Sequence, residues 1–395
     1  MIPPPTTSRP VRGTTAEVAV LDHGSSSSAD LSRLRVGMVT PGFPPQLGGV
    51  EMVVGQLAAS VARTHQVEVL AHRPRRSSLR SETYGANIAV ERFADWTGTR
   101  QFSVAPGLWR YLRRRPDAFD VLHAHSFHSS AAMAAARMTD QPLVFTPHYH
   151  GVGHSRTARA LHIGYDRLAA RIFDRATSVI CVSQAEADLL SRDYPRSAKK
   201  IVVIPNGIDT AGIRAATPFR LERPVILAAG RLEKYKQVEI TVRAFAHLGP
   251  DPILVISGTG PTLPALRELT IELGIENRVR FVGFISTDEL QRWYRTAAVT
   301  VTLSRHEAFG LVLLEAAVAG ARVVASDIPA HRELVATIGD CASLVPLDAS
   351  VREVAAVIER ELTHTNSHAR DLEVPSWDDV AGRTVELYRA AQGAT

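Results

Sequence analysis

Two glutamates stand eight positions apart in the stretch SRHEAFGLVLLEAAVAG, residues 304–320. Glu307 lies just before AFG, whereas Glu315 lies inside an apolar run that is otherwise typical of a protein core. Burial of an unpaired carboxylate is strongly unfavourable, so Glu315 needs a partner. A hydroxyl-rich ligand can supply one, because a carboxylate accepts two hydroxyl donors at once. The two glutamates therefore indicate a site for a polyol.

Two cations occur together in AGRLEKYKQ, residues 229–237. Arg231 and Lys236 lie in a loop that we expect to follow a buried strand. The chain has only four lysines against 41 arginines, and two of the four lie in this loop. A guanidinium and an ammonium on one loop could share a diphosphate, one as a bidentate donor and the other as a point charge. The competing interpretation is a solvated loop, which is the usual environment of these side chains.

Gly48 and Gly49 stand between the first expected strand and the first expected helix, in PPQLGGVE. Glycines at such a point let the backbone approach a phosphate and present amide N–H groups at the helix N-terminus. An ordinary tight turn is the alternative. A second pattern, GTGP at residues 258–261, lacks the third glycine of the dinucleotide fingerprint, so we predict no nicotinamide or other cofactor.

Two His-x-His pairs occur, one in HAHSFH (123–128) and one in TPHYHG (146–151). On a strand this spacing points both rings to the same face, where they could bind a metal ion. Neither pair has a carboxylate or a cysteine at ligand spacing, and no Asp-x-Asp pair occurs to hold a metal–diphosphate. We therefore predict no metal site.

Short apolar runs alternate with helical patterns in two series, which predicts two parallel sheets with helices on both faces. The first series runs through RVGMVT, VEVLA, DVLHAH, PLVFTPH, SVICVS and IVVIPNG. The second runs through PVILAAG, PILVISG, VRFVGF, VTVTLS and ARVVAS. The fold class is therefore α/β, with two doubly wound, Rossmann-like domains facing a central cleft. Such sheets bind ligands beyond the carboxyl ends of their strands, where the residues above are expected to lie.

The expected boundaries follow from the same pattern. Residues 1–30 are rich in proline and serine and are predicted to be a disordered leader. The first domain covers residues 31–207 and the second covers 208–375, with the break in the irregular segment near 206–224. A last helix, at about residues 376–393, is expected to pack back on the first domain.

The composition is that of a globular protein, with 45% hydrophobic and 22% charged residues. Cys181 and Cys341 have no metal-ligand spacing and are expected to be small buried hydrophobic residues. No apolar run is long enough to span a membrane, and the N-terminus lacks the apolar stretch of a signal peptide. We therefore expect a cytoplasmic protein.

Positive charge is concentrated in the first half of the chain. Residues 31–175 contain 19 arginines, no lysine and 10 acidic residues, a net charge of +9, whereas the whole chain carries +5. Arg113, Arg114 and Arg115 form one cluster. A solvated basic surface is the usual interpretation, and attraction to an anionic acceptor or to the inner membrane face is the alternative. We predict no nucleic-acid partner, and the sequence does not define an oligomeric state.

Taken in order, these residues resemble the retaining nucleotide-sugar glycosyltransferases of family 4, which have the GT-B fold. The resemblance covers about residues 34–390. It rests on the Gly-Gly-Val-Glu loop, VIPNGID, GRL with a lysine five residues after the arginine, FVGF, and Glu-x7-Glu with FGLVLLEA. The chain departs from the family at Gln237, where glycine is usual, and at SDIPAHREL (326–334), which replaces a more glycine-rich stretch. These departures leave two parts of the donor undefined: the transferred sugar, and the base of the nucleotide, which could be that of UDP or of GDP.

The resemblance implies a role for each charged or polar side chain. Arg231 and Lys236 would hold the donor diphosphate. Glu307 would bind hydroxyls of the transferred sugar, and Glu315 would bind the ribose hydroxyls, which would provide its partner. His125 would hydrogen-bond the donor sugar near the reaction centre.

The resemblance also implies backbone contacts with the donor. The segments expected to make them are the diphosphate loop at Gly48 and Gly49, the sugar loop at Ala308, Phe309, Gly310 and Leu311, and the base loop at Gly283, Phe284 and Ile285.

The implied activity is the metal-independent transfer of a hexose from a nucleoside-diphosphate sugar to a hydroxyl of a glycan, a glycolipid or a small natural product. One alternative is a non-catalytic sugar-nucleotide-binding protein, but Arg231, Lys236, Glu307 and His125 are all present. Another is a GT-B-like sugar-nucleotide epimerase, which the Glu-x7-Glu and GRL patterns disfavour. A nicotinamide dehydrogenase is a more distant alternative. No motif identifies the acceptor.

Overall fold

The computed structural model describes residues 33–46, 48–78, 80–97, 103–127, 129–151, 169–364 and 372–393. By their contacts, the described residues from 34 onwards form one compact unit. The leader predicted at residues 1–30 lies outside the described residues.

The first sheet has eight strands in the order β3-β4-β2-β1-β5-β6-β7-β8, and all neighbours are parallel except β3 and β4. The strands are β1 (Arg35–Thr40), β2 (Gln66–Pro74), β3 (Ser81–Tyr84), β4 (Ile88–Asp95), β5 (Val121–His125), β6 (Leu143–Thr146), β7 (Ser178–Cys181) and β8 (Ile201–Val203). The helices around it are α1 (Gly49–Val61), α2 (Pro106–Arg114), α3 (Ser130–Met138), α5 (Gln184–Asp193) and α13 (Trp377–Gly393).

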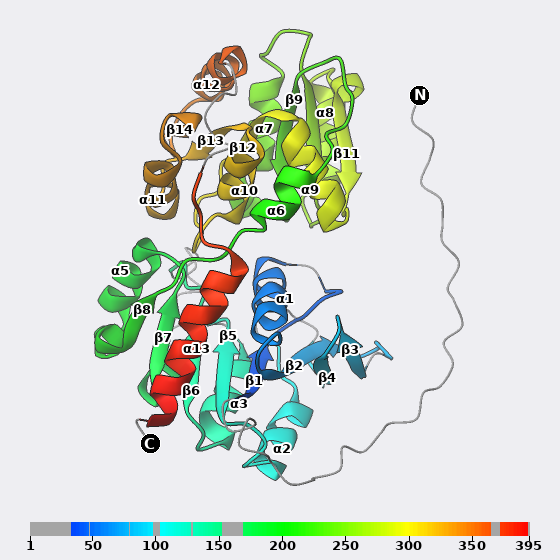
Figure 1. Ribbon diagram of the computed structural model, residues 1–395. Coiled ribbons are helices and arrows are strands. Elements are labelled where there is room, and N and C mark those ends of the chain that lie inside the picture. The colour runs from blue at the N-terminus through cyan, green and yellow to red at the C-terminus, as the bar shows by residue number, and fades with distance from the viewer. Residues whose placement is uncertain are drawn as a thin grey trace. The chain divides into compact units, whose positions relative to one another are not determined.

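The second sheet has six parallel strands in the order β11-β10-β9-β12-β13-β14. They are β9 (Val225–Ala229), β10 (Ile253–Ser257), β11 (Val279–Gly283), β12 (Ala297–Thr302), β13 (Arg322–Ser326) and β14 (Ala342–Val345). Its helices are α6 (Thr210–Ala215), α7 (Val238–Phe245), α8 (Leu263–Glu272), α9 (Thr287–Thr296), α10 (Leu311–Ala319), α11 (Pro329–Ile338) and α12 (Val351–Thr363). Both sheets are visible in Figure 1.

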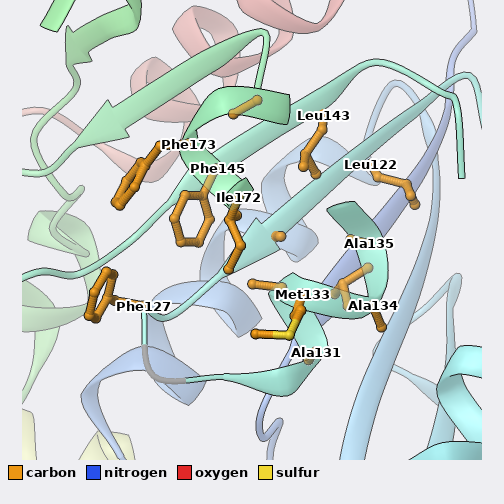
Figure 2. Close-up of a cluster of buried hydrophobic side chains, with 14 of the residues drawn as sticks. Leu122, Phe127, Ala131, Met133, Ala134, Ala135, Leu143, Phe145, Ile172 and Phe173 are labelled. Carbon is orange, nitrogen blue, oxygen red and sulfur yellow. The ribbon is translucent and has the colours of Figure 1, made fainter. Parts of the chain in front are cut away.

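Strand alternation places an apolar cluster on each face of the first sheet. Val36 and Met38 of β1 belong to the cluster that α1 and α13 cover, whereas Val39 belongs to the opposite cluster. Figure 2 shows this second cluster, in which alanines of α3 lie beside Leu122, Leu143 and aromatic side chains. Small alanine side chains let the helix approach the sheet closely.

The last helix, α13, covers one face of the first sheet. It packs along α1 and also contacts β5 and β6. Val380, Val385 and Tyr388 are its buried contacts in the cluster that includes Val36 and Met38. In Figure 1 this helix is red and lies beside the blue α1.

The fold prediction is confirmed, because the chain forms two parallel α/β sheets with helices on both faces. Each apolar run named above as a strand candidate lies on a strand. Strands β3, β4 and β14 were not predicted from the sequence. Strands β3 and β4 form the antiparallel pair at one edge, joined through Gly85 at a φ of +61°, and β14 is a half-buried edge strand. Edge strands bury less surface, so their apolar pattern is weaker.

Three further expectations concern the cysteines, membrane-spanning helices and surface charge. Both cysteines are buried free thiols, as predicted. Within the described ranges, no helix is long and apolar enough to cross a bilayer. Arg113, Arg114 and Arg115 are exposed at the end of α2, and the two interpretations of this basic surface stay predictions.

Close backbone packing accounts for the two glycines of GTGP. Gly258 has a φ of +132°, and a Cβ atom there would lie 1.8 Å from the carbonyl oxygen of Gly230. A Cβ atom at Gly260 would lie 2.2 Å from the carbonyl oxygen of Leu232. Leu232 in turn donates its N–H to the carbonyl of Thr259 over 2.9 Å. The glycines therefore let the loop after β10 pack against the loop that carries Arg231.

We expect Gly258→Ala to lower the free energy of unfolding by about 2–3 kcal/mol. Alanine disfavours the positive φ of this position, and its methyl group would clash with the carbonyl oxygen of Gly230. Chemical denaturation monitored by circular dichroism measures the change. The matched control is Gly382→Ala, at an exposed position of α13 where a Cβ atom meets nothing within 4 Å. It should stabilise the helix by about 0.5–1 kcal/mol. Equal effects of the two substitutions would contradict the packing role of Gly258.

Candidate active site

The loop after β9 carries both predicted diphosphate ligands. Arg231 is exposed, and its Nη2 donates a hydrogen bond of 3.0 Å to the hydroxyl of Tyr235. A 3-10 turn over Lys234–Lys236 places the Lys236 ammonium 5.4 Å from the centre of the Tyr235 ring. The N–H of Arg305 donates to the carbonyl of Tyr235 over 2.9 Å. That bond ties this loop to the loop after β12, the neighbouring strand.

Lys236 forms an ion pair with Glu307, so two residues predicted to bind different parts of a ligand contact each other. Their side chains are 18% and 17% exposed. Burial acts to raise the pKa of the Glu307 carboxyl, but the charge and hydrogen bond of Lys236 outweigh it and hold this pKa below its ordinary value. Glu307 is therefore ionised at neutral pH and needs a cation or hydroxyl donors.

The loop that follows Glu307 ends at the start of α10. Gly310 occupies the N-cap with a φ of +111°, so this helix begins without a capping side chain. A Cβ atom at Gly310 would lie 3.3 Å from the ring of His331 and 3.2 Å from Leu334, both on α11. Phe309 is buried, whereas Ala308 and Leu311 are half-buried. Backbone amides at an uncapped helix start suit an anion or a hydroxyl oxygen.

Glu315 lies in the second turn of α10, and its partner in the protein is Tyr294 of α9. The Tyr294 hydroxyl donates to Oε2 of Glu315 over 2.9 Å. Burial raises the pKa of Glu315 to about 7, the Tyr294 hydrogen bond lowers it, and the negative charge of Asp209 raises it. The Tyr294 hydroxyl thus binds only one oxygen of the Glu315 carboxylate, and the carboxylate can accept hydrogen bonds from further donors.

His125, at the end of β5, belongs to a group of three histidine rings. Its ring centre lies 4.1 Å from that of His123 and 5.8 Å from that of His148. The side chain is 0% exposed, and neither ring nitrogen has a hydrogen-bond partner among the residues that the structure describes. Burial and the two neighbouring rings hold the pKa of His125 well below its ordinary value. The ring is neutral, and in this structure it has no surface open to a ligand.

The first His-x-His pair points both rings to one face, as strand geometry predicts. The second pair does not lie on a strand, because β6 ends at Thr146 and His148 has a φ of +50°. Its rings diverge: His148 stacks on His125, and His150 stacks on His306 at 4.8 Å. In the described segments, no three histidine, cysteine or carboxylate side chains are arranged to hold a metal ion.

Gly48 and Gly49 begin α1 in different environments. A Cβ atom at Gly48 would lie 2.0 Å from a carboxylate oxygen of Glu51, which folds back over the loop. A Cβ atom at Gly49 would meet nothing within 4 Å. Gly48 therefore makes room for Glu51, whereas Gly49 leaves open space at the helix N-terminus.

The predicted base loop follows β11. Gly283 has a φ of +70°, and its carbonyl accepts the N–H of Gly258 over 2.7 Å. Phe284 is 57% exposed and Ile285 is half-buried. Gln237, the departure from the family pattern, adopts the left-handed conformation with a φ of +50°. Glycine enters this region without strain, which explains why glycine is usual there.

The structure brings the predicted residues together in three groups. Arg231, Lys236 and Glu307 meet where the loops after β9 and β12 join. Glu315 forms a second group with Tyr294, and His125 forms a third with the histidines of the first sheet. His150 lies next to the first group through its ring contact with His306.

Three residues that contact the predicted ones were not predicted from the sequence. Tyr235 binds Arg231, Tyr294 binds Glu315, and His331 packs on Gly310. Tyr235 stood inside the quoted AGRLEKYKQ loop, and His331 stood inside the stretch that departs from the family. Tyr294 had no local signal, since it is 21 positions from Glu315.

Two family models match the chain. The one described as Glycosyltransferase Family 4 matches residues 47–211, and the one described as Glycosyl transferases group 1 matches residues 209–371. A D-inositol 3-phosphate glycosyltransferase from Geodermatophilus obscurus is 30% identical over 71% of this chain and 68% of its own length. An uncharacterized glycosyltransferase from Methanocaldococcus jannaschii is 26% identical over 91% of this chain and 98% of its own length.

Solved structures agree on the fold. Sucrose-phosphate synthase from Thermosynechococcus elongatus superposes with a TM-score of 0.74 at 22% identity, covering 92% of this chain and 100% of that one. HepE from Anabaena superposes with a TM-score of 0.69 at 20% identity, covering 91% and 100%. The two sheets described above correspond to the GT-B fold of glycosyltransferase structures such as sucrose-phosphate synthase.

The raised pKa of Glu315 predicts a pH-dependent effect on stability. Its folded pKa of about 7 exceeds the unfolded value, so folding favours the protonated acid and the contribution is lost as pH rises towards 7. Glutamine is neutral at every pH. Glu315→Gln should therefore raise the free energy of unfolding by roughly 1–3 kcal/mol at pH 8 and by little near pH 4.5. Thermal and chemical unfolding at both pH values measure the difference.

Glu353 provides a control of opposite sign. It is exposed in the capping box of α12, and hydrogen bonds with Ser350 lower its pKa. Glu353→Gln should therefore gain no stability at pH 8. A Glu315→Gln protein that is no more stable than wild type at pH 8 would show that the carboxylate is already fully compensated.

Proposed function

The chain belongs to family 4 of the glycosyltransferases, and from this premise we propose that it transfers a hexose from a nucleoside-diphosphate sugar to an acceptor hydroxyl, with retention at the anomeric carbon. The observation that carries the proposal is the convergence of Arg231, Lys236 and Glu307 at the ends of β9 and β12. Two cations beside one carboxylate suit a ligand that is anionic at one end and hydroxylated at the other.

Proteins of the same fold support a nucleotide-sugar donor. HepE from Anabaena has been solved with UDP-glucose, and the pneumococcal O-GlcNAc transferase GtfA has been solved with UDP and GlcNAc. By analogy, the diphosphate of our proposed donor would lie between Arg231 and Lys236. Open space at Gly49 suits a phosphate oxygen at the N-terminus of α1.

Donor binding would exchange partners at the Lys236–Glu307 pair. Lys236 would turn to a phosphate oxygen, and Glu307 would accept hydroxyls of the hexose near the start of α10. The exchange keeps each charge compensated, so the pair costs little to open. At the other end of the donor, Glu315 would accept the ribose hydroxyls while Tyr294 holds one carboxylate oxygen.

His125 would contact the hexose after His148 moves away. Both ring nitrogens lack partners in the described part of the chain, so a sugar hydroxyl would satisfy a buried polar group. Its low pKa keeps the ring neutral at pH 7, with one N–H donor and one acceptor. We assign it a hydrogen-bonding role and not that of a proton donor.

In the proposed reaction, the bond between the anomeric carbon and the phosphate oxygen breaks as the acceptor oxygen approaches on the same face. The departing phosphate oxygen takes the proton of the acceptor hydroxyl, so charge and atoms balance. Negative charge on the diphosphate grows in the transition state, where Arg231, Lys236 and helix N-terminal amides stabilise it. These groups do what a metal ion does in other transferases, so we propose metal-independent transfer.

Arg231→Ala and Lys236→Ala should each cost about 3–4 kcal/mol in kcat/KM, comparable to the loss of one oxyanion donor. The double variant should cost less than the sum, because both cations act on one group. Lys234→Ala is the matched control, since it removes an exposed lysine from the same turn. Steady-state kinetics against a panel of nucleotide sugars, beside thermal melts, measure these effects. Near wild-type kinetics in either single variant would remove the diphosphate role.

Transfer should continue at an undiminished rate in excess EDTA, because the cations that stabilise the leaving group are side chains. The assay compares initial rates of chelated enzyme with and without added Mn²⁺ or Mg²⁺. Loss of activity on chelation and its return with either ion would contradict metal independence.

A further inference from the structure

Tyr388 of α13 reaches the histidine group of the first sheet from 265 positions away in the chain. Its side chain is fully buried, and its hydroxyl lies 2.7 Å from Nδ1 of His123. The two rings meet edge to face, with centres 5.6 Å apart. A buried phenolic hydroxyl needs a partner, whereas phenylalanine would fill the same space without one. The hydroxyl is therefore explained by its bond to His123.

His123 is held at both ring nitrogens. Its Nε2 lies 2.8 Å from the hydroxyl of Thr146, at the end of β6. Burial lowers the pKa of His123 to about 3, so the ring is neutral, with one donor and one acceptor nitrogen. The ring cannot turn without breaking both bonds, which fixes its plane between α13 and β6.

His125 depends on that plane. In the described segments it makes no hydrogen bond of its own, and its ring contacts are His123 at 4.1 Å and His148 at 5.8 Å. His148 lies in a loop, outside any strand, with a φ of +50°. Of the two neighbours, His123 is on the same strand and is anchored at both nitrogens, so it is the one that orients the His125 ring.

We propose that Tyr388 is a positioning residue for His125, and that α13 thereby completes the site on the first sheet. The proposal deepens the role given to His125 under the proposed function and rests on it. It assigns the last helix a task in catalysis besides covering the sheet. The cations proposed for the diphosphate and the carboxylate proposed for the ribose lie on the second sheet, so we expect loss of this contact to act more on turnover than on donor binding.

Tyr388→Phe tests the proposal, since it removes only the hydroxyl. We expect the ring ¹⁵N and ¹H resonances of His123 and His125 to move or broaden in the ligand-free protein. Turnover should fall about tenfold, as expected for a misplaced contact, while the donor KM stays within about twofold. Thr146→Val, which removes the other anchor, should reproduce both effects, and Thr146→Ser, which keeps the hydroxyl, should not.

Tyr111→Phe is the matched control, because it removes a tyrosine hydroxyl that binds Glu68 in the same half of the chain. It should leave the His125 resonances and turnover unchanged. Unmoved His125 resonances in Tyr388→Phe, or an equal loss of turnover in Tyr111→Phe, would overturn the proposal. If wild-type protein transfers no sugar at all, the proposed function is wrong, and the ring resonances still decide whether Tyr388 orients His125.

Discussion

The ion pair between Lys236 and Glu307 is the contact on which the rest of the site depends. It joins the loops after β9 and β12, two neighbouring parallel strands whose carboxyl ends meet at one edge of the second sheet. Each charge makes the partial burial of the other tolerable, because an unpaired buried charge is costly. Around this pair the fold adds a tyrosine beside Arg231 and an uncapped helix at Gly310. A ligand that replaces the pair must bring both an anion and hydroxyl groups.

Burial controls the chemistry of the first sheet in a different way. His123, His125 and His148 all have pKa values below the ordinary range for histidine because they lie in an apolar environment close to one another. Neutral imidazoles are hydrogen-bond donors and acceptors at physiological pH and carry no charge. Within the candidate site, the charged side chains therefore lie on the second sheet, and the histidines on the first sheet are uncharged. This division suits a molecule with a charged leaving group and a neutral sugar.

Much of this was predictable from local patterns. The strands followed from short apolar runs, and Glu307, Arg231 and Lys236 stood out because charged residues follow buried strands at the edge where ligands bind. The partners of these residues were not predictable in the same way. Tyr294 and Tyr388 act across 21 and 265 positions, and a buried tyrosine on a helix has the same pattern as any core residue. Strands β3 and β14 were missed because they are half-exposed edge strands with a weak apolar pattern. Strand β4 lies between β3 and β2, and it was missed because Glu91 and Arg92 interrupt its apolar residues.

Placement of α13 on the first sheet has a consequence for how the protein is made. The helix that covers β5 and β6 is translated only after the whole second sheet, so the first domain emerges from the ribosome with one face incomplete. At about 5–20 residues per second, the 265 positions between His123 and Tyr388 take tens of seconds to synthesise. During that interval the apolar surface that Val380, Val385 and Tyr388 later cover faces water. A chaperone can therefore bind this apolar surface of the nascent chain until α13 has been synthesised and packs on it.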